Sequence, residues 1–243
     1  MKNSEKTAQN YLIIGGGIAG VSAAEAIRKA DGEGKITLIC NEPELPYFRM
    51  NLTRYLAGEY EEEKLPLHPK SWYETNKVEL LLETTVDKID LDEKTVHLEG
   101  DGSLSYDKLV LANGAQPFVP PFPGRDLDGV WTVRTHEDAD EILDCCQGEV
   151  DVVCIGGGLL GLENAGALAK QGASVTVIET FDWLLPRQLP KEGGKQLEKL
   201  IHKLGIKVIT GGKVKAIKGE GKVSAVSFED GSEIPADLVL VTT

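Results

Sequence analysis

One stretch decides the fold, reading DVVCIGGGLLGLE from Asp151 to Glu163 and then SVTVIE from Ser174 to Glu179. The first apolar run, rich in β-branched residues, predicts a buried parallel strand, and the glycines after it open a helix. The second apolar run predicts another strand, which ends in a carboxylate. Strand, glycines, helix, strand and acid in this order predict a βαβ unit that binds a dinucleotide.

Each glycine of this stretch has its own mechanical role. Gly156 permits the tight turn after the strand, Gly158 lets the backbone approach a pyrophosphate, and Gly161 lets helix and strand pack closely. The free N–H groups at the start of the helix, around Leu159 and Leu160, are suited to bind the phosphates.

The carboxylate at the end of the second strand is the expected partner of an adenosine ribose. Glu179 lies 23 positions after Gly156, near the spacing of about 20 that is typical of such an acid. A carboxylate repels a 2′-phosphate, and no arginine directly follows this one. The sequence therefore favours NADH over NADPH.

The same pattern occurs earlier in the chain, offset by 141 positions. A short apolar strand at Tyr11–Ile14 precedes a glycine turn and a strong helix former, and Lys35–Cys40 is the second strand. The residues expected to bind this second dinucleotide are Gly15, Gly17, Ile18, Ala19 and Gly20. Two dinucleotides in one chain suggest electron transfer between them.

Candidate polar residues follow the first copy. Its second strand ends at Cys40, so Glu42 is the nearest acid for the ribose, and Asn41 could do part of the same task. Arg49 and Arg54 could neutralise phosphate or flavin charge, or they could belong to a solvated basic face. The charge run at 59–64 is interpreted as a solvated surface.

The composition excludes several classes of function. With 26 Lys+Arg against 39 Asp+Glu, the net charge is −13, which disfavours nucleic acid and anionic membranes as partners. No apolar run approaches 20 residues, so no membrane span is expected. Residues 1–7 are polar and do not resemble an export signal, and the four cysteines have no Cys-x-x-Cys spacing, so a reduced, cytoplasmic protein is expected. The four histidines are scattered, and no metal site is expected.

The fold class predicted is α/β, with two Rossmann-like dinucleotide-binding domains of three layers (ββα), one following the other. Each βαβ unit is followed by a meander of short strands, at 86–107 and at 214–234. The proline-rich segment 116–124 is the best candidate for the crossing between domains. The expected boundaries are therefore 1–115 and 116–243.

These residues together resemble the FAD-dependent pyridine nucleotide-disulfide oxidoreductases, in particular the NADH:rubredoxin and ferredoxin reductases and the flavoprotein part of nitrite reductases. The family's Tyr-x-Arg-x-x-Leu segment beside the flavin matches Tyr47 to Leu52, and its NADH motif matches Gly156 to Glu163. Its Ala-Thr-Gly turn matches Ala112-Asn113-Gly114, with Asn in place of Thr. The resemblance implies FAD in the first domain, beside Arg49, and NADH in the second.

The resemblance also implies a mechanism. The cofactors carry the chemistry, and electrons pass from NADH through the flavin to a small redox protein or a fused or associated reductase module, such as rubredoxin, ferredoxin or nitrite reductase. In such proteins the glutamate of the NADH motif pairs with a basic residue near the flavin N5. Here these catalytic residues would be Glu163 and Arg54. A homodimer is left open.

The chain departs from the family in three ways. No Cys-x-x-x-x-Cys follows the first glycine motif, and Met50 stands where related thiol enzymes carry a reactive cysteine. Disulfide and thiol chemistry are therefore disfavoured. The Gly-Asp motif with which relatives hold FAD is absent, so the alternative interpretation is a non-catalytic or split-chain fragment that needs a second segment to hold FAD.

Overall fold

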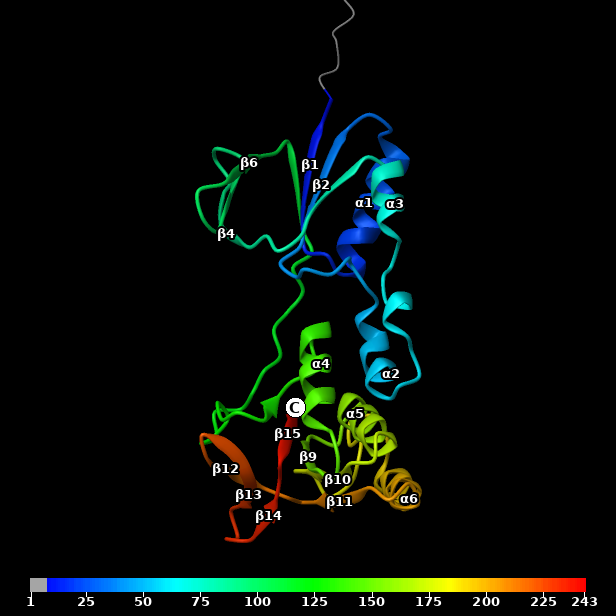
Figure 1. Ribbon diagram of the computed structural model, residues 1–243, viewed down its shortest axis with the longest axis vertical. Helices are drawn as coiled ribbons and strands as arrows, with labels where there is room; N and C mark the ends of the chain where they lie inside the picture. The colour runs from blue at the N-terminus through cyan, green and yellow to red at the C-terminus, as the bar shows by residue number, and fades with distance from the viewer. Residues whose placement is uncertain (1–7) are drawn as a thin grey trace, which may run out of the picture. The chain divides into compact units, whose positions relative to one another are not determined.

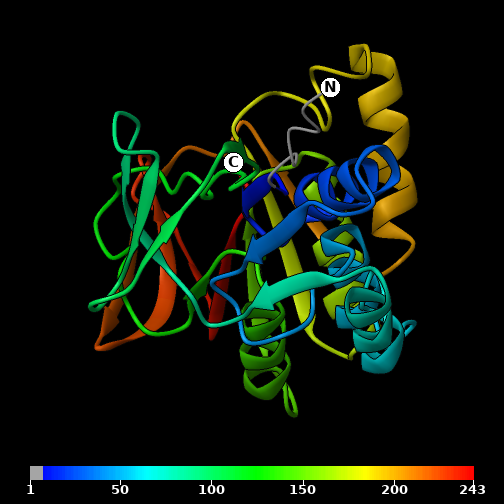
Figure 2. The same cartoon turned by 90° about the horizontal axis from the view of Figure 1, so that it is seen from above.

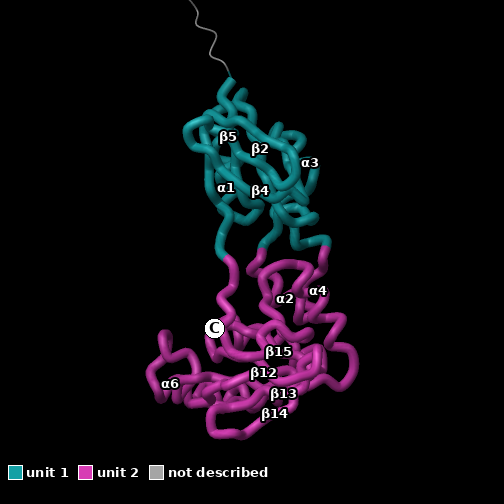
Figure 3. Tube along the Cα trace, turned by 90° about the vertical axis from the view of Figure 1, so that its left-hand side faces the viewer, with its two compact units in different colours: residues 1–48, 63–115 teal, residues 49–62, 116–243 magenta. Residues whose placement is uncertain are grey.

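The computed structural model describes residues 8–243. Residues 1–7, for which the sequence predicts no export signal, lie outside the described residues. The chain forms two compact units (Figure 3). Unit 1 contains the described residues up to Phe48 together with Glu63–Ala115, and unit 2 contains Arg49–Glu62 and Gln116–Thr243. The segment Arg49–Glu62 thus belongs to unit 2, although it interrupts unit 1 in the sequence. The assignment of 1–115 to FAD and 116–243 to NADH stays a prediction.

Unit 1 contains a parallel sheet, two helices, a short 3₁₀ turn and a meander. Its elements are β1 (Asn10–Ile14), α1 (Ile18–Ala30), β2 (Lys35–Ile39), η2 (Glu62–Lys64, which starts on the last residue of unit 2), α3 (Lys70–Thr75), β3 (Val78–Leu81), β4 (Val86–Asp90), β5 (Thr95–Leu98), β6 (Ser103–Ser105) and β7 (Lys108–Leu111).

The parallel sheet of unit 1 has the order β3-β2-β1-β7 and separates two hydrophobic layers. Side chains alternate between its faces. Ile13 and Leu38 pack on the side of α1 and α3, whereas Leu12 and Ile39 pack against the meander β4–β6. Figures 1 and 2 show the helices on one side of this sheet and the meander on the other. Burial on both faces explains why these strands are predominantly apolar.

Unit 2 repeats this arrangement with additional elements. They are η1 (Arg49–Asn51), α2 (Leu52–Leu56), β8 (Val130–Trp131), α4 (His136–Cys145), β9 (Asp151–Ile155), α5 (Leu159–Lys170), β10 (Ser174–Glu179), α6 (Lys191–His202), β11 (Lys207–Thr210), β12 (Val214–Glu220), β13 (Lys222–Phe228), β14 (Glu233–Pro235) and β15 (Leu238–Val241).

The parallel sheet of unit 2 has the order β11-β10-β9-β15-β8. One face packs on the meander β12–β14 through a core that includes Ile155, Val226 and Val239. Helices α5 and α6 lie against the strands β9–β11 (Figure 1). The predicted α/β class with two Rossmann-like domains is confirmed, and so are the two meanders. Residues 8–243 contain no helix that combines the length and the apolar character needed to cross a membrane.

Arg28 joins the end of α1 to the turn before β3 inside unit 1. Its guanidinium donates to the carbonyls of Asn76 (2.7 Å), Asp31 (3.0 Å), Gly32 (2.9 Å) and Lys77 (3.0 Å). Lys77 adopts a left-handed conformation with φ 51°, so the turn depends on contacts from outside itself. Only a planar fork with several N–H groups can reach these carbonyls together.

Replacement of Arg28 by Lys keeps the charge and removes the fork. We expect Arg28→Lys to lower the free energy of unfolding by about 2 kcal/mol, within the range for hydrogen bonds to charged groups. Urea unfolding followed by circular dichroism measures this loss. The matched control is Lys29→Arg on the exposed side of the same turn, which we expect to change stability by less than about 0.5 kcal/mol. Equal midpoints for the two variants would contradict the assigned role.

Candidate functional site

The second glycine loop connects β9 to α5 in unit 2. Gly156 has φ +119°, a backbone conformation that residues with a side chain rarely adopt. A Cβ at this position would lie 2.8 Å from the carbonyl oxygen of Thr242. The Gly156 N–H donates to the carbonyl of Ile178 (2.8 Å), which ties the turn to β10. Gly156 therefore meets both conditions under which only glycine fits.

Gly161 brings the helix close to this turn. A Cβ on Gly161 would lie 1.9 Å from the carbonyl oxygen of Gly156, far inside van der Waals contact. The first turn of α5 can therefore pack on the end of β9 only because position 161 has no side chain. This is the role that the motif predicts for its third glycine.

The N-terminus of α5 is uncapped. Gly158 is the N-cap residue, with φ −78° and ψ −177°, and no side chain accepts a hydrogen bond from the first turn. The first helical bond runs from Leu162 N–H to the carbonyl of Gly158 (3.0 Å), and among residues 8–243 the N–H groups of Leu159, Leu160 and Gly161 have no acceptor. A Cβ on Gly158 would meet nothing within 4 Å. Unpaired N–H groups facing open space fit the phosphates of a dinucleotide.

The first glycine loop, in unit 1, has the same geometry. Gly15 has φ +113° and donates to the carbonyl of Ile39 (2.8 Å), and a Cβ on Gly20 would lie 1.9 Å from the carbonyl of Gly15. Gly17 is the N-cap residue of α1, with φ −76° and ψ −178° and no capping side chain. The side chains of Ile18 and Ala19 in the first turn are exposed. This loop therefore also fits a dinucleotide phosphate.

The predicted Ala112-Asn113-Gly114 turn lies beside the first glycine loop. A Cβ on Gly15 would lie 2.2 Å from the carbonyl of Ala112, and Ala112 N–H donates to the carbonyl of Ile14 (2.8 Å). Asn113 and Gly114 follow β7 and are exposed. Thr242 has the equivalent place in unit 2, after β15.

The two candidate ribose acids differ in their surroundings. Glu179 is buried (7% exposed), and both of its carboxylate oxygens accept backbone bonds, from Gly157 N–H (3.0 Å) and from Phe181 N–H (2.9 Å). Glu42 is half-buried and accepts a bond from the hydroxyl of Tyr47 (2.6 Å). A carboxylate oxygen can accept more than one bond, so both acids retain capacity for a ribose hydroxyl. The sequence pattern did not indicate the Phe181 contact, because it depends on the loop after β10.

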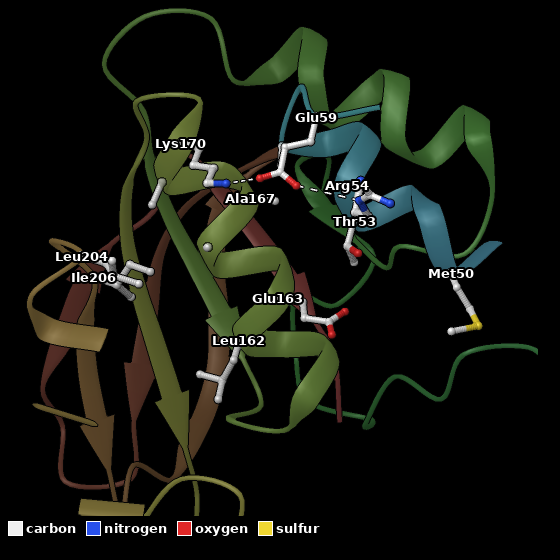
Figure 4. A pocket seen from close by; sticks show the side chains of 13 residues that line it. Met50, Thr53, Arg54, Glu59, Leu162, Glu163, Ala167, Lys170, Leu204 and Ile206 are labelled. Carbon is white, nitrogen blue, oxygen red and sulfur yellow. Dashed lines mark hydrogen bonds and ion pairs between the residues drawn. The ribbon is translucent and has the colours of Figure 1, made fainter. Parts of the chain in front are cut away.

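A pocket of about 500 Å³ lies between α2 and α5 of unit 2 (Figure 4). Its apolar wall includes Leu162, Ala167, Leu204 and Ile206. Its charged lining consists of Arg54 and Glu59, from α2 and the turn after it, and Glu163 and Lys170, from α5.

The structure brings Arg54 and Glu163 to this one pocket without joining them. The Nε atom of Arg54 is 3.9 Å from a carboxylate oxygen of Glu59, and its guanidinium lies 5.1 Å from the centre of the Tyr60 ring. No hydrogen bond or ion pair links Glu163 to any residue in the described part of the chain. The predicted Glu163–Arg54 pair is thus not formed in this structure, and the roles of both residues stay a prediction.

Glu59 and Lys170 are pocket residues that the sequence did not reveal. The Lys170 ammonium donates to Oε1 of Glu59, and this bond is the main reason that the pKa of Glu59 lies below its usual value. In the sequence Glu59 begins a charge run that is typical of a solvated surface. Only the packing of α2 on α5 shows that Glu59, the first residue of this run, binds a residue of another helix.

Arg49 lies in unit 2, as Arg54 does, whereas the glycine loop, Glu42 and the turn at 112–114 that are predicted to bind FAD lie in unit 1. Its Nη1 donates to the carbonyl of Arg134 (2.6 Å). Its role toward flavin or phosphate charge stays a prediction.

Three of the four cysteines are buried, and only Cys145 is exposed. Cys40, Cys146 and Cys154 are buried, and burial raises the pKa of Cys146 to about 11, which keeps it protonated at neutral pH. Across residues 8–243 no group of three or more His, Cys, Asp or Glu side chains could hold a metal ion.

Several known proteins with similar sequences or structures are named reductases. The chain is 37% identical to the nitrite reductase [NAD(P)H] of Bacillus subtilis, over 96% of this chain and 29% of that protein. It is 34% identical to the ferredoxin reductase component of chlorobenzene dioxygenase from a Cupriavidus species, over 96% of this chain and 57% of that protein. Among solved structures, the covalent putidaredoxin reductase–putidaredoxin complex matches with a TM-score of 0.89 and 33% identity, over 96% of this chain and 58% of the matched chain.

The chain therefore spans between 29% and 58% of the length of these three relatives. The family whose pattern it matches, over residues 9–243, is described as pyridine nucleotide-disulphide oxidoreductase. This match covers both glycine loops and the pocket between α2 and α5. The chain belongs to the pyridine nucleotide-disulphide oxidoreductase family.

Proposed function

We propose that this protein is an FAD-dependent NADH oxidoreductase that passes electrons from NADH, through the flavin, to a separate acceptor. One observation carries the proposal: the chain presents two glycine loops, each followed by an uncapped helix N-terminus with open space before it. Such a terminus attracts the pyrophosphate of a dinucleotide through free N–H groups and the helix dipole. The names of the similar reductases support the same activity.

The residues that would hold FAD are on the first loop. The N–H groups that follow Gly17 bind the pyrophosphate, Glu42 accepts from the ribose, and the exposed turn at 112–114 offers backbone groups beside the loop. When bound, FAD supplies the ability to accept two electrons from NADH and to release them singly.

The second loop would hold NADH. The amides after Gly158 bind its pyrophosphate, and Glu179 binds the adenosine ribose. Because Glu179 is buried and held at both oxygens by backbone amides, it cannot swing away from a 2′-phosphate. This fixed negative charge favours NADH over NADPH.

Arg54 and Glu163 are proposed to tune the electrostatics where hydride transfer takes place. They line the pocket between α2 and α5, whose wall is otherwise largely apolar. Both charges would act on the charge that develops as hydride is transferred.

The acceptor is proposed to be a small redox protein or an associated reductase module. One similar protein is named a ferredoxin reductase component and another a nitrite reductase. Rubredoxin, ferredoxin and a nitrite reductase module are the specific candidates, within the cytoplasm.

The proposed phosphate sites can be tested at positions where the fold itself tolerates a side chain. A Cβ on Gly158 or on Gly17 would meet nothing within 4 Å, and both residues have ordinary extended conformations. The methyl group of Gly158→Ala would keep the pyrophosphate from the amides of the first turn. We expect NADH binding to weaken about tenfold or more, because a hydrogen bond to a charged group contributes about 1.5–3 kcal/mol. Gly17→Ala should lower the FAD content instead.

Each of these variants is the control for the other. NADH affinity is measured by fluorescence titration, FAD content by visible absorbance, and stability by urea unfolding. We expect both proteins to stay folded, with a free energy of unfolding within about 1 kcal/mol of the wild type, because alanine is less favourable than glycine at an N-cap. Unchanged NADH affinity in Gly158→Ala would show that the second loop does not bind the pyrophosphate.

Glu179→Gln tests the preference for NADH. The neutral amide no longer repels a 2′-phosphate, and its NH₂ group cannot accept the backbone bond that a carboxylate oxygen accepts. We expect the ratio of the dissociation constants for NADPH and NADH to fall about tenfold, measured by titration of each nucleotide. The control is Asp182→Asn, which removes an exposed charge three positions later. An unchanged ratio in Glu179→Gln would show that Glu179 does not contact the adenosine ribose.

A further inference from the structure

The segment that carries Arg54 is fastened to unit 2 at several points. The Tyr55 hydroxyl donates to a carboxylate oxygen of Asp140 on α4 (2.6 Å), and Gln171, directly after α5, donates to the carbonyl of Leu56 (2.8 Å). The Lys170–Glu59 bond is a third connection. Because the backbone of α2 is held in this way, the partner of Arg54 depends only on the conformation of the Arg54 side chain.

Arg54 has two carboxylates available in the same pocket. Its contact with Glu59 is long (3.9 Å), and the two side chains are 55% and 42% exposed. A long ion pair in contact with water is weak. Glu163 lines the same pocket and pairs with no other described residue (Figure 4). A small difference in free energy therefore decides between the two partners.

Lys170 biases this choice. It lies seven residues after Glu163 on α5, so the two side chains share one face of the helix and are separated by about 10 Å along its axis. By binding Glu59, Lys170 holds that carboxylate near the C-terminal end of α5. Arg54 follows Glu59, away from the end of the pocket where Glu163 lies.

We propose that Glu59 is a positioning residue that selects the partner of Arg54, holding the guanidinium in a place where Glu163 stays unpaired. When the charge of Glu59 is removed, Arg54 turns to Glu163 and neutralises it. The effect on NADH oxidation rests on the proposed function, since it depends on Arg54 and Glu163 acting where hydride is transferred. The choice of partner itself does not depend on that function.

The test observes Arg54 directly. The chain has six arginines, so the Nε–Hε signals of the full chain labelled with ¹⁵N-arginine can be resolved by NMR, and Arg54→Lys identifies the signal of Arg54. We expect Glu59→Gln to move this signal. Glu163→Gln should leave it in place in the wild-type background and move it in the Glu59→Gln background, because only there does Arg54 contact Glu163.

Two controls keep the result specific. Glu63→Gln removes the same charge from the same run at an exposed position, and it should leave the Arg54 signal unchanged. The Arg49 signal reports whether the segment stays fastened to unit 2, because Arg49 is bound to the carbonyl of Arg134. An unmoved Arg54 signal in Glu59→Gln would overturn the proposal. So would a joint shift of Arg49 and Arg54, which would mean that Glu59 only fastens α2 to α5.

The rate of flavin reduction by NADH tests whether the partner of Arg54 affects NADH oxidation. Glu59→Gln should change this rate at least about twofold when Glu163 is present and leave it unchanged in the Glu163→Gln background, as residues in contact are not additive. Equal effects in the two backgrounds would contradict the functional consequence. Absence of flavin reduction in the wild type would refute the proposed function, whereas the NMR result would still decide the partner of Arg54.

Discussion

The structure depends on one close approach, made twice, between a helix and the turn that precedes it. In unit 2 a Cβ on Gly161 would lie 1.9 Å from the carbonyl of Gly156, and in unit 1 Gly20 has the same relation to Gly15. A side chain at either position would push the helix away from the strand end. The helix N-terminus would then no longer direct its free N–H groups at the space before the N-cap glycine. Packing and the capacity to bind a phosphate thus come from the same missing atoms.

This constraint explains what the sequence could predict. The end of the strand, the tight turn at the first glycine and the start of the helix are local properties, so the order of residues from Asp151 to Glu163 was sufficient to predict them. The occurrence of the same pattern 141 positions earlier predicted a similar fold for unit 1. Each unit indeed contains a parallel sheet and a meander. Ala112 and Thr242 close the equivalent side of each turn.

The sequence could not predict contacts that depend on packing between distant segments. The segment at 49–62 interrupts unit 1 in the chain, yet it packs in unit 2, because Tyr55 and Glu59 bind Asp140 and Lys170. No local pattern records such a contact, and for this reason the pairing of Arg54 with Glu59 was not foreseen. The two ribose acids differ in a similar way. Glu179 accepts backbone bonds from the glycine loop after β9 and from the turn after β10, whereas Glu42 binds a tyrosine side chain.

The proposed activity requires that one chain hold two dinucleotides between which electrons pass. Its most direct test is the visible spectrum of the purified full chain, recorded without oxygen before and after addition of NADH. We expect a yellow protein with one FAD per chain that loses its colour on addition of one equivalent of NADH. A colourless protein that still binds NADH would contradict it, and would instead support a nucleotide-binding fragment that needs a second segment to hold FAD.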